Sequence, residues 1–328
     1  MNKKGSFLFL VILVAGAYAF ISYIDKKNHT PIPTPTPTLE PTPTANLQLP
    51  TYQAVAKARA ICLDIKQSNP EVEPYFTSEF RQYLEFVLKR LGLSITKPGS
   101  ACDATLVFEL EGVPRGAKYA NAPEYCYTGA NILGEVTVTA AQGEPITYDV
   151  RWGLPPQEGV IGYCSKKFEA PFPFVTKLNA YRVLFDLWGL NALVFDYTYD
   201  LQRLIERNGE AYLVRYCCGL VSEEYRQLIL KSEERAIPIL AKHLEDRDEL
   251  VRVAAVAFLG ALADKKNQAT SYLIEMLDDT YRVTLNYKDV YPVRKIAHDF
   301  LVNMFGRDVG YDKQEWYREL TLATPEAP

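Results

Sequence analysis

The segment AIPILAKHLEDRDELVRVAAVAFLGALAD (236–264) decides how the second half of the chain folds. Apolar residues recur every three or four positions on both sides of a polar stretch, LEDRDE (244–249). This spacing is typical of two amphipathic helices joined by a short turn. Several alanines and Gly260 on the second helix would let a neighbouring helix approach closely. One helix pair cannot bury its apolar stripe alone, so the segment requires stacked neighbours.

A second helix pair repeats the pattern in ATSYLIEMLDD (269–279) and, after an insertion, YPVRKIAHDFLVNMFG (291–306). In both pairs Leu-acidic-Asp ends the first helix and Val-Arg-x-x-Ala opens the second. The matching residues are Leu244, Val251, Arg252 and Ala255 in one pair and Leu277, Val293, Arg294 and Ala297 in the other. This pattern resembles the HEAT-repeat family over about residues 233–306. A less regular helical stretch precedes it (199–230), and the ending at 305–320 resembles segments that close bacterial HEAT-repeat proteins.

The resemblance implies stacked helix pairs that present a concave surface to a partner. It also implies that Arg252 pairs with Asp246 or Asp248 and braces the turn between two helices, so the repeated arginines are assigned structural roles. Because the array is short, we expect it to lean on the preceding domain at one end and on Trp316 and Tyr317 at the other.

Residues 51–197 carry a different pattern, in which short alternating segments dominate. Alternation of apolar and polar residues predicts strands, and apolar residues at helical spacing predict helices. The predicted strands are 58–66, 103–112, 130–140 and 146–152, and the predicted helices are 77–93 and 174–188. We therefore expect an α+β fold: a mostly antiparallel sheet packed with helices, followed by a short all-α helical repeat array (198–320) and a disordered tail (321–328).

The N-terminus predicts a membrane signal. Lys3 and Lys4 precede FLFLVILVAGAYAFISYI (7–24), an apolar run close to the roughly 20 residues that span a bilayer as a helix. Ala17-Tyr18-Ala19 fits a cleavage site, which would give a secreted protein, but the apolar run continues beyond it. We therefore predict an uncleaved signal-anchor at 1–27, with a single pass through the cell membrane and the bulk of the chain extracytoplasmic.

The stretch HTPIPTPTPTLEPTPT (29–44) lies at the centre of a Pro/Thr-rich linker that we place at 28–50. Alternating proline favours polyproline II, an extended and solvated backbone that behaves as a semi-rigid spacer. The sequence therefore predicts a folded part that is held away from a membrane surface.

Four cysteines fall in the predicted α+β domain: Cys62, Cys102, Cys126 and Cys164. Their co-location is typical of an oxidising compartment, although four cysteines allow three pairings and buried free thiols are an alternative. If the last three strands form a meander, Cys126 lies near Cys164 at one end of the sheet and Cys102 lies at the opposite end. This reasoning favours a Cys126–Cys164 disulfide and leaves Cys62 with Cys102 as the less certain pair.

The sequence carries none of the common catalytic motifs, such as Gly-x-Ser-x-Gly, a phosphate-binding loop, His-Glu-x-x-His or Cys-x-x-Cys. The sequence has only three histidines, so few ligands are available for a histidine-based metal site. His298-Asp299 is interpreted as a surface pair on a helix. We assign no catalytic, cofactor-binding or metal-binding residue and do not expect an enzyme. A net charge of −4 and a pI near 5.6 disfavour a nucleic-acid partner.

The insertion TYRVTLNYKDV (280–290) supplies the candidate partner-binding residues Tyr281, Arg282, Tyr287 and Lys288. Insertions in repeat proteins tend to emerge as loops on one face, often the binding face, although a loop without a role fits equally well. The sequence predicts a membrane-anchored extracytoplasmic binding or scaffold protein with a protein partner in the bacterial cell envelope. The alternative is a cell-wall or glycan-binding protein, possibly glycan-active, that uses tyrosine-rich loops (119–127 and 281–291).

Overall fold

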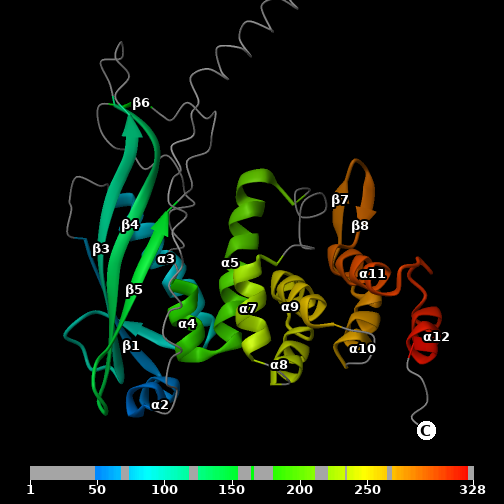
Figure 1. Ribbon diagram of the computed structural model, residues 1–328, viewed down its shortest axis with the longest axis horizontal. Coiled ribbons are helices and arrows are strands. Elements are labelled where there is room, and N and C mark those ends of the chain that lie inside the picture. Colours follow the sequence, from blue (N-terminus) through cyan, green and yellow to red (C-terminus); the bar gives the residue numbers. More distant parts are fainter. Residues whose placement is uncertain are drawn as a thin grey trace, which may run out of the picture. The chain divides into compact units, whose positions relative to one another are not determined.

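The computed structural model describes residues 49–67, 74–117, 125–153, 164–165, 180–210, 221–232, 235–263 and 268–323 (Figure 1). The predicted anchor and almost all of the Pro/Thr linker lie outside these ranges, as does most of the tyrosine-rich loop at 119–127. Asn46–Pro328 form one compact unit. Among the described residues, no helix has the length and apolar character needed to cross a bilayer.

A mixed sheet forms the first part of this unit, in the strand order β2-β1-β3-β4-β5, with β6 also paired to β4. The strands are β1 (Ala60–Gln67), β2 (Ser94–Thr96), β3 (Ala104–Ala117), β4 (Tyr125–Ala140), β5 (Ile146–Gly153) and β6 (Cys164–Ser165). The predicted α+β fold is confirmed, and β3, β4 and β5 form the expected antiparallel meander. β1 differs, because both of its neighbours, β2 and β3, run parallel to it.

The two faces of the sheet differ as the alternation predicts. The apolar face is buried and carries Ile61, Leu63, Leu106, Phe108, Leu110, Val136, Val138 and Val150. Helix α3 (Pro74–Arg90) covers it, and the ring of Phe80 meets the ring of Phe108 edge-on at 5.1 Å. The opposite face carries exposed side chains of Glu109, Glu135 and Asp149, which lie side by side across β3, β4 and β5.

Helix α3 begins at Pro74, three residues before the predicted start. Proline is favourable in a first helical turn because its missing N–H needs no partner there. A glycine follows the C-terminal end of the helix. Gly92 has φ +80°, its N–H donates to the carbonyl of Lys89, and the N–H of Leu93 donates to the carbonyl of Leu88 at 3.0 Å. This is a Schellman motif, which favours glycine at the left-handed position.

Helices dominate the remainder of the unit (Figure 1). A short helix, α2 (Pro50–Lys57), precedes the sheet, and the later helices are α4 (Ala180–Trp188), α5 (Leu190–Asn208), α7 (Glu223–Lys231), α8 (Ala236–His243), α9 (Glu249–Leu262), α10 (Gln268–Glu275) with the 3₁₀ turn η3 (Met276–Asp278), α11 (Pro292–Phe305) and α12 (Lys313–Ala323). The predicted domain boundary at 197/198 falls inside the continuous helix α5.

A buried carboxylate joins the sheet layer to the helices. Asp196 on α5 is fully buried and accepts hydrogen bonds from the hydroxyl of Tyr83 on α3, at 2.5 Å, and from the hydroxyl of Tyr225 on α7. Burial, reinforced by the Asp196 charge, raises the pKa of both tyrosines well above the usual value, so both remain donors. Arg90 at the end of α3 also forms an ion pair with Asp248 in the turn between α8 and α9.

Helix α9 is the most deeply buried element of the helical part. Val251 and every residue from 253 to 259 are buried, because α5, α7, α8, α10 and α11 all pack against this helix. Gly260 permits a close contact with α11: a Cβ at this position would lie 2.2 Å from the Phe300 ring. The matched repeat positions Leu244 and Leu277, Val251 and Val293, and Ala255 and Ala297 are buried in both helix pairs.

Helix α12 packs on α10 at the C-terminal end. Trp316 is fully buried, and its indole N–H donates to the carbonyl of Gly310 at 2.7 Å. The hydroxyl of Tyr317 donates to Glu275 at 2.6 Å, and the ammonium of Lys313 lies 2.7 Å from the same carboxylate. The two aromatic residues thus close the array as expected. The helix ends at Ala323, within the stretch predicted as a tail.

Candidate functional site

The insertion between α10 and α11 is a β-hairpin rather than the loop predicted, and the expectation of no strand in this part of the chain is wrong. Strands β7 (Val283–Leu285) and β8 (Lys288–Val290) pair antiparallel, with Leu285 opposite Lys288 (Figure 1). Asn286 and Tyr287 form the two-residue turn with φ of 50° and 63°. Two positive φ angles are the signature of a type I′ turn, which matches the twist of hairpin strands.

The hairpin tip holds a tyrosine where glycine is preferred. The second turn position of a type I′ turn favours glycine, because a side chain is strained in the left-handed region. Tyr287 nevertheless occupies it, and its side chain is fully exposed (102% relative accessibility). Neither packing nor backbone preference accounts for a tyrosine here, and strained positions of this kind tend to cluster at functional sites.

The four candidate residues do not form one surface. Tyr287 and Lys288 are exposed at the tip. Arg282 is also exposed, but its guanidinium lies 3.1 Å from the carboxylate of Asp289 across the hairpin. Tyr281 is half-buried at the base, where burial raises its pKa to about 12. The hairpin therefore presents one aromatic ring and one ammonium to solvent, while the other two residues support its structure.

Asp279 anchors the base of the hairpin. Its carboxylate accepts a hydrogen bond from the N–H of Tyr281 at 2.8 Å and two from Arg252, at 2.7 Å and 3.4 Å. Its carbonyl accepts a further bond from Arg294. Val283 is 2% exposed, so the first strand also contributes to the core. The tip thus projects from a fixed base that belongs to the repeat turns.

The predicted partners of Arg252 were wrong in detail. Arg252 does not pair with the carboxylate of Asp246 or Asp248. It donates to the carbonyl of Asp246 at 2.9 Å and forms its ion pair with Asp279 of the next helix pair. Asp248 instead accepts from the N–H of Leu250 and caps α9. The arginine therefore links successive helix pairs as well as bracing its own turn, which supports its structural assignment.

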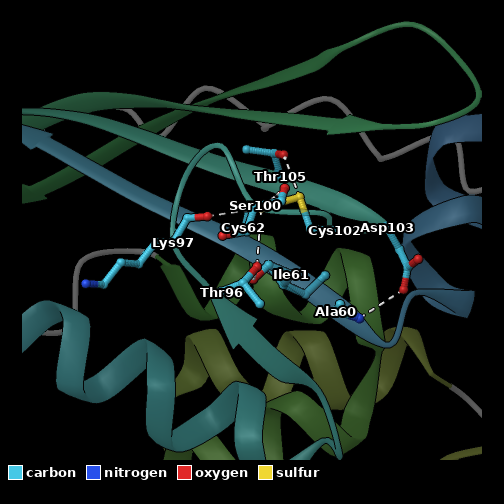
Figure 2. Close-up of a disulfide and its surroundings, with 9 residues drawn as sticks. All are labelled: Ala60, Ile61, Cys62, Thr96, Lys97, Ser100, Cys102, Asp103 and Thr105. Atoms are coloured by element: carbon cyan, nitrogen blue, oxygen red, sulfur yellow. Dashed lines mark hydrogen bonds between the residues drawn. A yellow bond between two sulfur atoms is a disulfide. The ribbon is translucent and has the colours of Figure 1, made fainter.

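A disulfide joins Cys62 to Cys102, with Cα atoms 5.7 Å apart (Figure 2). The bond ties β1 to the loop that precedes β3. Cys62 is buried, and its sulfur lies 3.3 Å from the hydroxyl of Thr96. Beside it, the carboxylate of Asp103 accepts the N–H groups of Arg59 and Ala60 at 2.8 Å and 2.9 Å. These backbone N–H donors hold the pKa of Asp103 below its usual range.

One of the two predicted cysteine pairs, Cys62 with Cys102, is confirmed. The pair that had been the less certain choice is bonded, because parallel pairing with β3 places Cys62 beside the start of that strand. The meander argument for Cys126 and Cys164 holds for the backbone, since the two residues are direct partners on β4 and β6. Their side chains lie outside the described structure, so their disulfide stays a prediction.

His298 is not the surface residue that the sequence suggested. It is buried, its Nε2 lies 2.8 Å from a carboxylate oxygen of Asp308, and its ring stacks on Tyr311 at a centroid distance of 4.5 Å. A hydrogen bond from the N–H of Gly310, and to a smaller extent the one with His298, hold the pKa of Asp308 below its usual range. These contacts fix the turn after α11. Among the residues with described positions, no group of three or more His, Cys, Asp or Glu is arranged to hold a metal ion.

Comparison with known proteins identifies no family for this chain. No protein-family model matches this chain, and no curated protein matches it.

Proposed function

We propose that this protein is a membrane-anchored extracytoplasmic binding or scaffold protein, and that it engages a protein partner of the cell envelope through its helical part. The apolar run and Pro/Thr linker of the sequence motivate the anchor and the distance from the membrane. The HEAT-repeat resemblance stays a prediction, and the stacked, mutually burying helix pairs are in keeping with it.

The observation that carries the proposal is the exposed ring of Tyr287 in a left-handed backbone conformation. Tyrosine is enriched among the residues that dominate binding energy at protein interfaces, because a large ring with few rotatable bonds can be buried at low entropic cost. Lys288 beside it adds a cation that steers acidic partners. Because the base under this tip is fixed, binding would cost little further conformational entropy.

The test compares two single variants for capture of envelope proteins by the full-length chain. Tyr287→Gly removes the ring and relaxes the turn, so the protein itself should be at least as stable as the wild type. Replacement of the whole segment is a poorer test, because it also removes the buried Val283. Leu322→Ala is the matched control, since Leu322 is an exposed apolar residue (72%) on α12, outside the hairpin.

We expect quantitative mass spectrometry to identify a protein that is retained by the wild type and Leu322→Ala but lost with Tyr287→Gly. Binding of that protein in purified form should then weaken by about tenfold or more on loss of the ring, as for a typical interface anchor. Equal retention by all three chains would contradict the proposal. Retention of purified cell-wall glycan through Tyr287, with no protein lost, would instead favour the glycan-binding alternative.

A further inference from the structure

One face of the β7–β8 hairpin balances its own charges. Thr284 and Asp289 are direct partners in the ladder, so their side chains project from the same face. The guanidinium of Arg282 lies 3.1 Å from one oxygen of the Asp289 carboxylate, and the hydroxyl of Thr284 donates to the other oxygen at 3.0 Å. Both oxygens of this carboxylate therefore have a donor, and the charges of the arginine and the aspartate cancel.

The other face carries a charge that the hairpin does not balance. Strand alternation places Val283, Leu285, Lys288 and Val290 on this face, with Leu285 directly opposite Lys288. Val283 is buried at the base, Leu285 and Val290 are half-buried, and Lys288 is exposed. Among the residues that the structure describes, no carboxylate forms an ion pair with the ammonium of Lys288. The tip therefore presents one uncompensated positive charge beside the ring of Tyr287.

The combination of one ring and one ammonium restricts what the tip can bind. A neutral glycan could stack on the ring of Tyr287, but it would leave the ammonium of Lys288 without a counter-charge. An anionic membrane attracts clusters of several basic residues, and a single uncompensated lysine is a weak signal for it. A protein surface can offer both an apolar recess for the ring and a carboxylate beside that recess, so charge complementarity favours a protein.

We propose that the partner of the hairpin is an acidic protein surface, in which an apolar recess receives the ring of Tyr287 and an aspartate or glutamate at its rim pairs with Lys288. This inference rests on the proposed function, because it specifies the chemistry of the partner at the same tip. The two residues have separate roles. A charge at the rim of an interface acts mainly on the rate of association, whereas a buried anchor acts mainly on the rate of dissociation.

The test measures both rate constants for the full-length chain, in a mild non-ionic detergent, with the purified protein whose capture depends on Tyr287. At low salt, Lys288→Glu should slow association by about tenfold and Lys288→Gln by about threefold, and salt should reduce both differences. Tyr287→Gly should instead speed dissociation. Lys57→Glu is the matched control, because it reverses the charge of an exposed lysine on α2 and should change neither rate constant.

A carbodiimide, which joins an amine directly to a carboxylate, provides a second readout. Mass spectrometry of the treated complex should find Lys288 linked to an aspartate or glutamate of the partner. Lys288→Arg should bind like the wild type but lose this link, because arginine keeps the charge and its guanidinium stays protonated. The far-UV circular dichroism spectrum and melting temperature of the Lys288 variants should match those of the wild type, since this side chain is exposed.

Three outcomes would overturn the inference, and they differ in what they leave standing. Unchanged association of Lys288→Glu, together with faster dissociation of Tyr287→Gly, would exclude an acidic partner but keep the proposed function. The double variant Arg282→Gln with Asp289→Asn preserves the net charge. If it weakened binding as much as Lys288→Glu, the contact would lie on the opposite face of the hairpin. The absence of any protein that depends on Tyr287 would remove the proposed function, and this inference with it.

Discussion

The sheet and the helical part of this protein bury their apolar side chains in different ways. The sheet buries one face against α3 and leaves a row of acidic side chains on the other. Successive residues of a strand therefore alternate between a buried and an exposed environment. Helix α9 is enclosed by five neighbouring helices, and almost every residue along its middle is inaccessible. The sheet part is held by a disulfide, whereas the helical part is held by packing and by ion pairs in its turns.

This difference shows where each part can carry a surface for other molecules. Helix α9 is largely enclosed by other helices and offers little surface to a partner, whereas the β7–β8 hairpin carries an exposed tyrosine ring at its tip. In the described part of the sheet, one face carries exposed side chains, so its accessible surface follows from the alternation along the strands. Four predictions test this difference between the sheet and the helical part.

The largest effect is expected in α9. Phe258 is fully buried, with ring centroids of Tyr197 and Tyr225 at 5.2 Å and 6.0 Å. Phe258→Ala should lower the free energy of unfolding by about 3–5 kcal/mol, because it removes the ring and leaves a cavity that surrounding helices cannot fill. Urea unfolding measures the change. Leu322→Ala, on an exposed residue, should change the stability by less than about 0.5 kcal/mol. Similar values for both variants would contradict the enclosed position of α9.

The second effect concerns the disulfide of the sheet. The bond closes a loop between residues 40 positions apart. The double variant Cys62→Ala with Cys102→Ala should be less stable by about 2–4 kcal/mol, chiefly because the unfolded chain gains conformational entropy when the loop is no longer closed. Unfolding in denaturant without reductant measures the loss. Peptide mapping of the unreduced wild type should recover Cys62 linked to Cys102, and it also decides whether Cys126 is linked to Cys164. Free thiols at Cys62 and Cys102 would refute the bond.

A third effect depends on pH and tests how well the helix side of the sheet excludes water. Burial raises the pKa of Asp186 on α4 to about 6, and the nearby cations Lys231 and Arg182 offset only part of the increase. The ordinary value is about 3.9, so the folded state holds this proton more tightly than the unfolded state. Stability from this group is therefore complete below about pH 4 and falls as the pH rises through about 6.

Asp186→Asn removes that titration. Because Asp186 is partly accessible, we expect the variant to be more stable than the wild type at pH 7 by only about 1 kcal/mol, with no difference at pH 4. Urea unfolding at the two pH values measures this. A wild type that gains stability relative to Asp186→Asn as the pH rises would show that the carboxylate is stabilised in its charged form instead.

The smallest effect is expected at the hairpin tip, where the substitution should again stabilise the protein. Tyr287→Gly should raise the free energy of unfolding by about 0.5–1 kcal/mol, because glycine adopts the left-handed turn position without strain. Tyr287→Phe is the matched control and should be neutral, since the exposed hydroxyl makes no difference to the backbone. A loss of stability in the glycine variant would mean that the ring is held for packing and would remove the main support for a binding role.

Much of the local structure could be predicted from the sequence, because periodicity reports the environment of each side chain. The stretch 236–264 predicts α8 and α9 with their buried stripes, and the alternation at 58–66 and 130–140 predicts β1 and β4. Gly92 ends α3 through its left-handed backbone, as its position after an apolar helical run indicates. The candidate site was found only in part: the insertion was located, but its hairpin was missed, since the turn has Asn-Tyr in place of the usual Asn-Gly.

The sequence by itself thus determined the longer helices and strands and which side of each is apolar, because these properties depend on neighbours three, four or two residues away. Only the tertiary structure decided which distant residues meet. The parallel pairing of β1 with β3 joined Cys62 to Cys102, the stacking of helix pairs gave Arg252 its partner Asp279, and the convergence of α3, α5 and α7 placed Asp196 between two tyrosines. Such contacts depend on chain topology over tens of residues, and no local pattern encodes them.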